Sequence, residues 1–200
     1  MVHSIRYRMV VAVRKRLSAQ DWTVAALEAI AVGGVAAVAV EPLAAQLGAT
    51  KGSFYWHFPG RDALLEAALR HWERVETEDV IAFVEAEPDV LARLRALLRI
   101  ALGSHDDRPI DRVELALQPT ANHPLVGPVL ARVTRRRLAY LDEQFVALGF
   151  DAEAARQRSL LAYTAYLGHG QLAHATPEMT PKGTALQAYV DAVVTTLVTR

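Results

Sequence analysis

The segment Val40 to Leu65 constrains the fold of this chain more than any other stretch of its sequence. Its first part has apolar residues at the spacing of one helical face, and Gly48 follows, a residue type that ends helices by accepting left-handed dihedrals. Thr50 offers a hydroxyl to cap a second helix, which Pro59 terminates, and Arg61 begins a third helix. Two short helices joined by a glycine-containing turn predict a helix-turn-helix unit.

The second helix of this unit carries a run of five ring-bearing side chains, from Phe54 to Phe58. A packed core would take Phe54 and Phe58, which lie four residues apart on one face. The other faces then present a lysine, hydroxyl groups, an indole and an imidazole, a surface that suits the phosphate-lined groove of a nucleic acid. The alternative is that Tyr55, Trp56 and His57 are also packed inside a helical domain.

The sequence L-A-A-Q-L-G-A-T-K-G-S-F-Y-W-H-F, residues 43–58, resembles the DNA-binding motif of the TetR family of transcriptional regulators. The family pattern has an apolar-Ala start, a central glycine, a Ser or Thr cap, a tyrosine, His-Phe and a basic residue at the start of the next helix. The resemblance covers residues 18–69 by motif, and the remainder by length and helical layout. The family often caps its first motif helix with Ser or Thr, whereas this chain reads Ala39-Val40-Glu41-Pro42. Because proline is tolerated only in a first turn, we expect a weakly capped helix that starts no earlier than Val40.

The resemblance implies a set of DNA-contacting residues and a set of partners. The positions placed to read bases are Lys51, Gly52, Ser53 and Trp56, and those placed to contact phosphates are Thr50, Tyr55, His57 and Arg61. The implied partners are a double-stranded DNA operator, a second copy of the chain in a homodimer and a small-molecule effector. The implied activity is transcriptional regulation, more often repression in this family, by binding a palindromic operator.

Composition and charge limit the classes of protein to which the chain can belong. The chain of 200 residues has no cysteine, which excludes disulfides, thiol catalysis and thiolate metal sites, and fits a cytoplasmic location. No apolar run approaches the length of a membrane span. Residues 1–70 hold eight lysines or arginines against five acidic residues, so their formal charge is +3, although the whole chain is formally neutral. The basic excess therefore coincides with the motif, although an ordinary solvated surface would give the same value.

The periodicity of the chain predicts an all-α fold of about nine helices. We expect a flexible basic arm at 1–17, a three-helix DNA-binding domain at 18–64 and a larger ligand-binding and dimerisation domain at 65–200. A disordered tail, or a start at Met9, would also account for the arm. The helix that begins at Arg61 is expected to run to about Glu87 and to link the two domains.

Two further sets of residues follow from the family's use of the larger domain. The candidates for a ligand pocket are Trp72, Leu98, Leu102, His105, Leu115, Gln118, Val133, Tyr140, Tyr163 and Tyr166. Each of them, taken singly, is also explained by core packing. The candidates for a dimer interface, on the wide apolar stripes of the last two helices, are Leu160, Thr164, Leu167, Leu186, Tyr189, Val190, Val193 and Leu197. The alternative is that these stripes only cover the monomer core.

Two rival functions stay open at this point. A helical enzyme or small-molecule carrier could have the same helical layout, but the chain has no phosphate loop, nucleophile elbow or H-E-x-x-H motif. The group His105, Asp106 and Asp107 is better explained as a turn, because it precedes Arg108-Pro109. No metal and no cofactor is expected. The second rival is a constitutive DNA-binding protein without a ligand.

Overall fold

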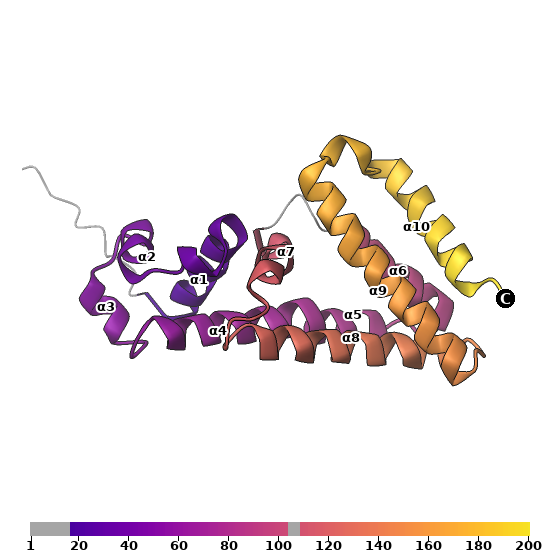
Figure 1. The fold of residues 1–200 in the computed structure, drawn as a ribbon, viewed down its shortest axis with the longest axis horizontal. Helices are drawn as coiled ribbons and strands as arrows, with labels where there is room; N and C mark the ends of the chain where they lie inside the picture. Colours follow the sequence, from indigo (N-terminus) through magenta and orange to yellow (C-terminus); the bar gives the residue numbers. More distant parts are fainter. Residues whose placement is uncertain (1–16, 104–108) are drawn as a thin grey trace, which may run out of the picture.

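The computed structural model describes residues 17–103 and 109–200, and within them the regular structure is entirely helical, as the periodicity predicts. The α-helices are α1 (Ala19–Gly33), α2 (Val40–Gln46), α3 (Lys51–Tyr55), α4 (Arg61–Glu73), α5 (Asp79–Glu85), α6 (Val90–Gly103), α7 (Val113–Leu117), α8 (Gly127–Ala147), α9 (Ala152–Ala175) and α10 (Gly183–Val198). Helices α1 to α3 form a head at one end of an elongated molecule, and α9 and α10 lie at the other end (Figure 1). The predicted basic arm lies outside the described residues except for Leu17.

The helix starts in the head follow from local sequence. Ser18 and Asp21 form a reciprocal capping box at the start of α1, as their spacing predicts. Helix α2 begins at Val40 and has no side-chain cap, which confirms the expectation drawn from the Pro42 departure. Thr50 caps α3 by accepting from the Ser53 N–H at 3.2 Å. Between α2 and α3, Gly48 has a φ of 60°, so the turn uses the left-handed conformation that glycine accepts without strain.

Helix α4 continues into α5 through one π-helical turn, Arg74–Glu78, so the long linking helix expected from Arg61 to about Glu87 is present. The turn is marked by a backbone bond from the Asp79 N–H to the Arg74 carbonyl, a five-residue step. In Figure 1 this helix leaves the head and runs beneath the rest of the molecule, with α8 alongside it. Arg132 of α8 ties the two helices together through a bidentate ion pair with Glu73, at 2.5 and 2.6 Å.

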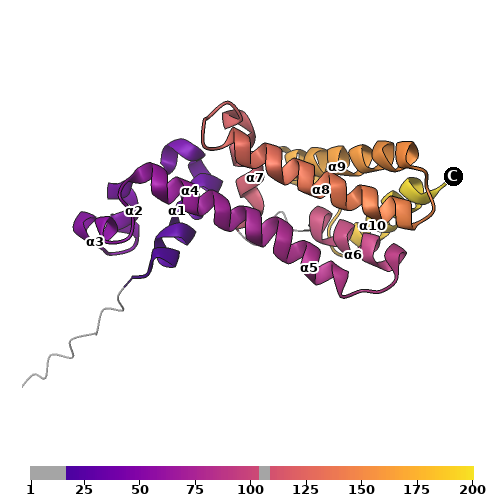
Figure 2. The ribbon, with the colours of Figure 1, turned by 90° about the horizontal axis from the view of Figure 1, so that it is seen from below.

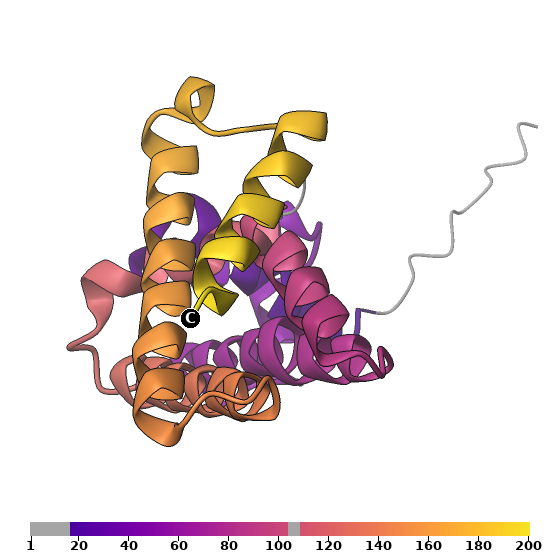
Figure 3. The ribbon, with the colours of Figure 1, turned by 90° about the vertical axis from the view of Figure 1, so that its right-hand side faces the viewer.

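The apolar core has two large parts. The first is built on the head and α4 but also includes Val113 and Leu117 of α7 and the first turns of α8. The second joins α6, the end of α8, α9 and α10. Figure 2 shows α7 and the start of α8 lying between the head and the far end, and Figure 3 shows α9 and α10 as neighbouring helices at that end. The head is therefore packed directly on the larger domain. Among the described residues, no helix combines the length and the apolar composition that crossing a membrane requires.

Candidate DNA interface and effector cavities

Helix α3 divides its aromatic side chains between the core and the solvent. Phe54 is fully buried, and its ring packs edge-on against Trp22 of α1, with centroids 5.3 Å apart. Phe58 is also buried. Trp56 is 83% exposed and Tyr55 53% exposed, although aromatic side chains this large usually bury most of their surface. The head therefore presents an indole and a phenol on the outer side of the helix-turn-helix, as the four-residue spacing of the two phenylalanines predicts.

Three polar residues of the candidate DNA interface lie on α3 or in the turn that follows it. Lys51 and Gly52 are exposed in the first turn of this helix, and Ser53 and His57 are half-buried. Lys51 donates a hydrogen bond from Nζ to Oε1 of Glu41 on α2. This carboxylate is absent from the set of site residues predicted from sequence. The signal that could have found it is that it is the only acidic residue between Val40 and Arg61.

The Arg61 side chain is fixed by contacts within the protein, although the sequence predicts that it contacts a phosphate. Its guanidinium donates from Nε to the Val38 carbonyl and from Nη2 to the Val35 carbonyl, both at 2.8 Å. Its Nη1 pairs with Asp62 at 3.1 Å. The side chain therefore fastens the start of α4 to the connector between α1 and α2. A contact to a phosphate remains a prediction, and it would have to coexist with this structural role.

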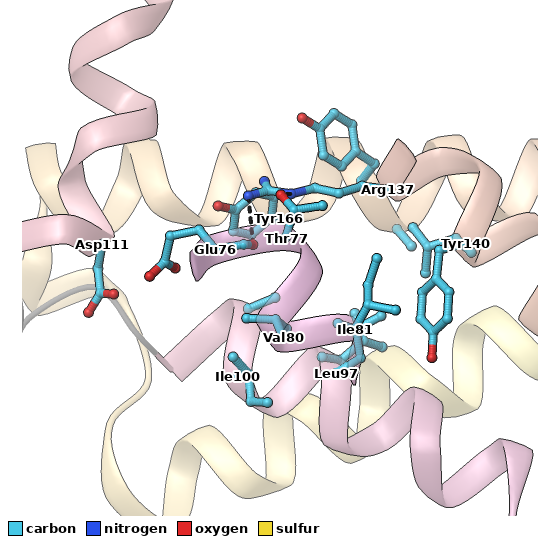
Figure 4. Close-up of a pocket in the computed structure, with 15 residues that line it drawn as sticks. Glu76, Thr77, Val80, Ile81, Leu97, Ile100, Asp111, Arg137, Tyr140 and Tyr166 are labelled. Carbon is cyan, nitrogen blue, oxygen red and sulfur yellow. Dashed lines mark hydrogen bonds between the residues drawn. The ribbon is translucent and has the colours of Figure 1, made fainter. Parts of the chain in front are cut away.

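A small cavity of about 90 Å³ lies between α5, α6, α8 and α9 (Figure 4). Its walls are mostly apolar, with aliphatic side chains from α5 and α6 such as Ile81, Leu97 and Ile100. Four of the ligand candidates predicted from sequence line it: Leu98, Tyr140, Tyr163 and Tyr166. A mostly apolar cavity with a few polar groups is typical of a small-molecule site, although most such sites are larger.

A buried polar cluster forms one end of this cavity, and Arg137 of α8 is its centre. The guanidinium donates to Glu114 of α7 at 2.6 Å, to the Thr77 hydroxyl at 3.1 Å and to the Glu76 carbonyl at 3.0 Å. Glu114 also accepts from the hydroxyls of Tyr166 and Tyr163, at 2.8 and 3.1 Å. The cluster thus joins α7, α8, α9 and the π turn.

Burial and the Glu114 charge determine the ionisation of this cluster. Burial opposes the charge of Arg137, but the neighbouring Glu114 carboxylate outweighs it and raises the pKa of the guanidinium, which stays charged. Burial, followed by the same carboxylate, raises the pKa of Tyr163 and of Tyr166, so both phenols stay protonated and donate. The sequence analysis missed Arg137 and Glu114. A single carboxylate inside the apolar segment V-E-L-A-L, residues 113–117, is the signal that could have found the pair.

A second, larger cavity of about 460 Å³ lies between α7 and the C-terminal half of α9. Its lining includes two further candidates from the sequence, Leu115 and Gln118, and it shares Asp111 and Tyr166 with the first cavity. Glu114 lines the second cavity, whereas its partner Arg137 lines the first. The ion pair and the Tyr166 ring therefore lie between the two spaces.

Three of the ligand candidates lie in the hydrophobic cores. Trp72, Leu102 and Val133 are at most 2% exposed, pack in the hydrophobic cores and line neither cavity. Their apolar character reflects core packing, which periodicity cannot distinguish from a pocket wall. His105, and with it Asp106 and Asp107, lies outside the described residues.

Part of the predicted dimer interface lies in the core of the monomer. Val190 and Leu197 of α10 are at most 3% exposed and pack in this core. The remaining α10 candidates, Leu186, Tyr189 and Val193, are half-buried against the same core, as is Leu167 of α9. Leu160 and Thr164 of α9 are exposed, together with Leu161 and Leu172, which the prediction omitted. The outward side of α10 carries small residues instead: Ala185, Ala188 and Ala192.

Residues 23–68 match the family model described as bacterial regulatory proteins, tetR family. The matched segment contains α2, α3, most of α1 and the start of α4. The resemblance to the TetR family is therefore confirmed, and the chain carries the helix-turn-helix domain of these transcriptional regulators. None of the curated proteins matches the chain.

Solved structures share the fold over nearly the whole chain. A transcriptional regulator from Rhodococcus sp. Rha1 is 19% identical, with a TM-score of 0.76, over 91% of this chain and 96% of its own. The fatty acid degradation regulator FadR from Bacillus halodurans is 18% identical, with a TM-score of 0.68, over 90% and 94% of the two chains. The multidrug binding protein EbrR, complexed with malachite green, is 23% identical, with a TM-score of 0.64, over 91% and 98%. The larger domain therefore has the fold of such regulators too.

Proposed function

We propose that the chain is a ligand-responsive transcriptional regulator, a repressor that binds a palindromic operator as a homodimer. Residues 18–64 would bind DNA, and residues 65–200 would bind the effector and form the dimer. The observation that carries the proposal is the 83% exposed Trp56, which follows α3 in a helix-turn-helix whose Lys51 is also exposed. A side chain of this size gains little from facing water, but it can pack on the apolar surface of a base such as the thymine methyl.

The DNA contacts follow from the exposure of α3. Lys51, Gly52, Ser53 and Trp56 would read base edges in the major groove, and Thr50, Tyr55, His57 and Arg61 would contact phosphates. The phosphate contacts would set the position of the head, and the base contacts would set its sequence preference. Two heads would bind half-sites one helical turn apart, on the order of 34 Å.

The effector would occupy the two cavities that meet at the Arg137–Glu114 pair. Together they offer aliphatic walls for an apolar body and a polar end for orientation. This proposal draws support from EbrR, a neighbour in fold that was solved with malachite green. An effector that binds one arrangement of the heads better than another lowers the DNA affinity by that difference in binding free energy.

The homodimer would use the exposed side of α9 and α10. The supporting observation is that Leu160, Leu161 and Leu172 are each more than 50% exposed on α9. On α10 the residues Ala185, Ala188 and Ala192 are exposed, and small side chains allow a second helix to approach closely. Two such helix pairs related by a two-fold axis would form a four-helix interface.

Selection of bound sites from random double-stranded DNA tests the function. We expect enrichment of a palindrome whose half-sites are centred about 10 base pairs apart. No enrichment, or a site without two-fold symmetry, would contradict the proposal.

Light scattering tests the dimer with the variant Leu161→Asp, which would place an unpaired carboxylate in the interface. We expect a folded monomer that has lost the palindromic site. The matched control is Phe83→Asp on α5, where a residue that is 69% exposed receives the same charge and the dimer should persist. A dimeric Leu161→Asp protein would show that this face is not the interface.

A further inference from the structure

The segment that forms the candidate DNA interface is electrically balanced. Between Val40 and Asp62 the chain has two cationic residues of the Lys/Arg type, Lys51 and Arg61, and two carboxylates, Glu41 and Asp62. In the structure each cation is paired with one of these carboxylates. Non-specific DNA binding is supplied by cations that neutralise phosphates, so these pairs bear directly on it.

The two pairs differ in how free the cation is. Arg61 is also fixed by two backbone carbonyls, whereas Glu41 is the one hydrogen-bond partner that the described residues give to Lys51. The Lys51–Glu41 pair bridges α3 and α2, and its side chains are 55% and 65% exposed. The hydrogen bond raises the pKa of Lys51 and lowers the pKa of Glu41, so both groups are charged at neutral pH. Lys51 is therefore an exposed cation paired with a carboxylate that can compete with DNA for it.

We propose that on DNA that lacks the operator sequence, where Lys51 has no matching base edge to read, Glu41 competes with the phosphates for Lys51 and thereby weakens binding. A lysine that moves from a carboxylate to a phosphate exchanges one anion for another and leaves Glu41 unpaired beside the polyanion. At a specific site the base contacts of α3 compensate for this loss, whereas at other sites nothing does. Glu41 is then a specificity determinant that acts without contacting a base. The inference rests on the proposed DNA-binding function.

The test compares wild type with Glu41→Gln on a 30-base-pair duplex of mixed sequence and on the selected operator. Affinities are measured by fluorescence anisotropy between 50 and 200 mM KCl. We expect the variant to bind the mixed duplex more tightly, with a salt slope steeper by about 0.9, as for one more phosphate neutralised. The increase in affinity for the mixed duplex, variant over wild type, should therefore be about 3.5-fold larger at 50 mM than at 200 mM salt. Operator affinity should rise less, so the ratio of specific to non-specific affinity should fall.

Two controls separate this role from a general charge effect. Glu28→Gln removes the same charge from the same head, but Glu28 accepts from the uncharged Gln46 at 2.9 Å, so no cation is released and the salt slope should not change. In a Lys51→Met background, Glu41→Gln should give no increase in slope, because the cation that it releases is gone.

Three results would overturn the inference. If Glu41→Gln loses operator affinity and leaves the mixed duplex unchanged, the carboxylate reads a base, as a glutamate can at cytosine. If Glu28→Gln gives the same gain, only net charge matters. If Glu41→Gln lowers the melting temperature and both affinities together, the pair is structural. Failure of wild type to bind any DNA would instead contradict the proposed function itself, and the inference would fall with it.

Discussion

Two ion pairs of this molecule, one on the head and one in the larger domain, show how burial changes what a charge can do. The side chains of Lys51 and Glu41 are 55% and 65% exposed, so water and salt compete with their attraction. Those of Arg137 and Glu114 are only 14% and 6% exposed. The hydroxyls of Tyr163 and Tyr166 donate to Glu114, and the Thr77 hydroxyl accepts from Arg137. Each buried charge would be very costly alone. The head therefore carries charge that can be exchanged with a ligand such as DNA, and the interior carries charge that fixes helices in place.

Removing the carboxylate of the buried pair should have one of the two largest effects on stability. Glu114→Gln leaves Arg137 charged and uncompensated, and we expect a loss of about 3–5 kcal/mol in the free energy of unfolding. Urea denaturation measures it. The control is Glu153→Gln, which breaks the exposed Glu153–Arg156 pair and should leave the midpoint unchanged. A Glu114→Gln protein as stable as that control would mean that the buried cluster does not hold the helices together.

The aromatic residues of α3 offer the same contrast for apolar side chains. Phe54→Ala should lower the free energy of unfolding by about 3–5 kcal/mol, because its ring is fully buried. Trp56→Ala should leave the melting temperature unchanged and weaken operator binding about tenfold, or about 1.4 kcal/mol. Thermal denaturation and anisotropy titration are run on both variants. A loss of stability in Trp56→Ala comparable to that of Phe54→Ala would place the indole in the core and remove the main support for the DNA interface.

His71, on the last turn of α4, gives the smallest expected effect. Burial, and then the nearby Arg74, lowers its pKa from the usual value of 6.5. The unfolded chain therefore takes up a proton before the folded chain does. Stability is complete above about pH 6.5 and should fall as the pH drops through that value towards the lowered pKa of the folded state. Stability curves from pH 8 to pH 5 for wild type and His71→Gln measure this, and identical slopes would contradict it.

The local sequence was sufficient to predict the structure of the head, because the residues that determine it lie close together in the chain. The capping pair Ser18 and Asp21, the Thr50 cap and the split between Phe54 and Trp56 each depend on a few neighbouring residues. The bonds from Arg61 to the Val35 and Val38 carbonyls span more than 20 residues, and no periodicity reports them. The same limit applies to the cluster around Arg137, whose partners come from three other segments.

The last helix shows why the width of an apolar stripe does not by itself identify an interface. Val190, Val194 and Leu197 have helical spacing and form the buried seam of α10, and Leu186 and Val193 pack along its edges. A stripe of this width is broader than the surface that one neighbouring helix would cover. In the structure α10 contacts α6 and the rest of the second core, so one domain covers it. The surface left open on α10 combines alanines with polar residues such as Gln187 and Asp191.

The π turn has a consequence for the phase of the long helix that links the head to the larger domain. Buried positions recur every three or four residues up to Trp72, the next is Thr77, five residues later, and Ile81 and Val84 then resume the normal spacing. One residue corresponds to about 100° of rotation in an α-helix. A straight α-helix through the same residues would therefore turn Ile81 and Val84 about 100° away from their core. Deleting one residue within 74–78 would instead restore the four-residue spacing, so the helix could run straight with Ile81 and Val84 still facing the core. The π turn thus absorbs one extra residue and keeps the buried faces of α4 and α5 in register.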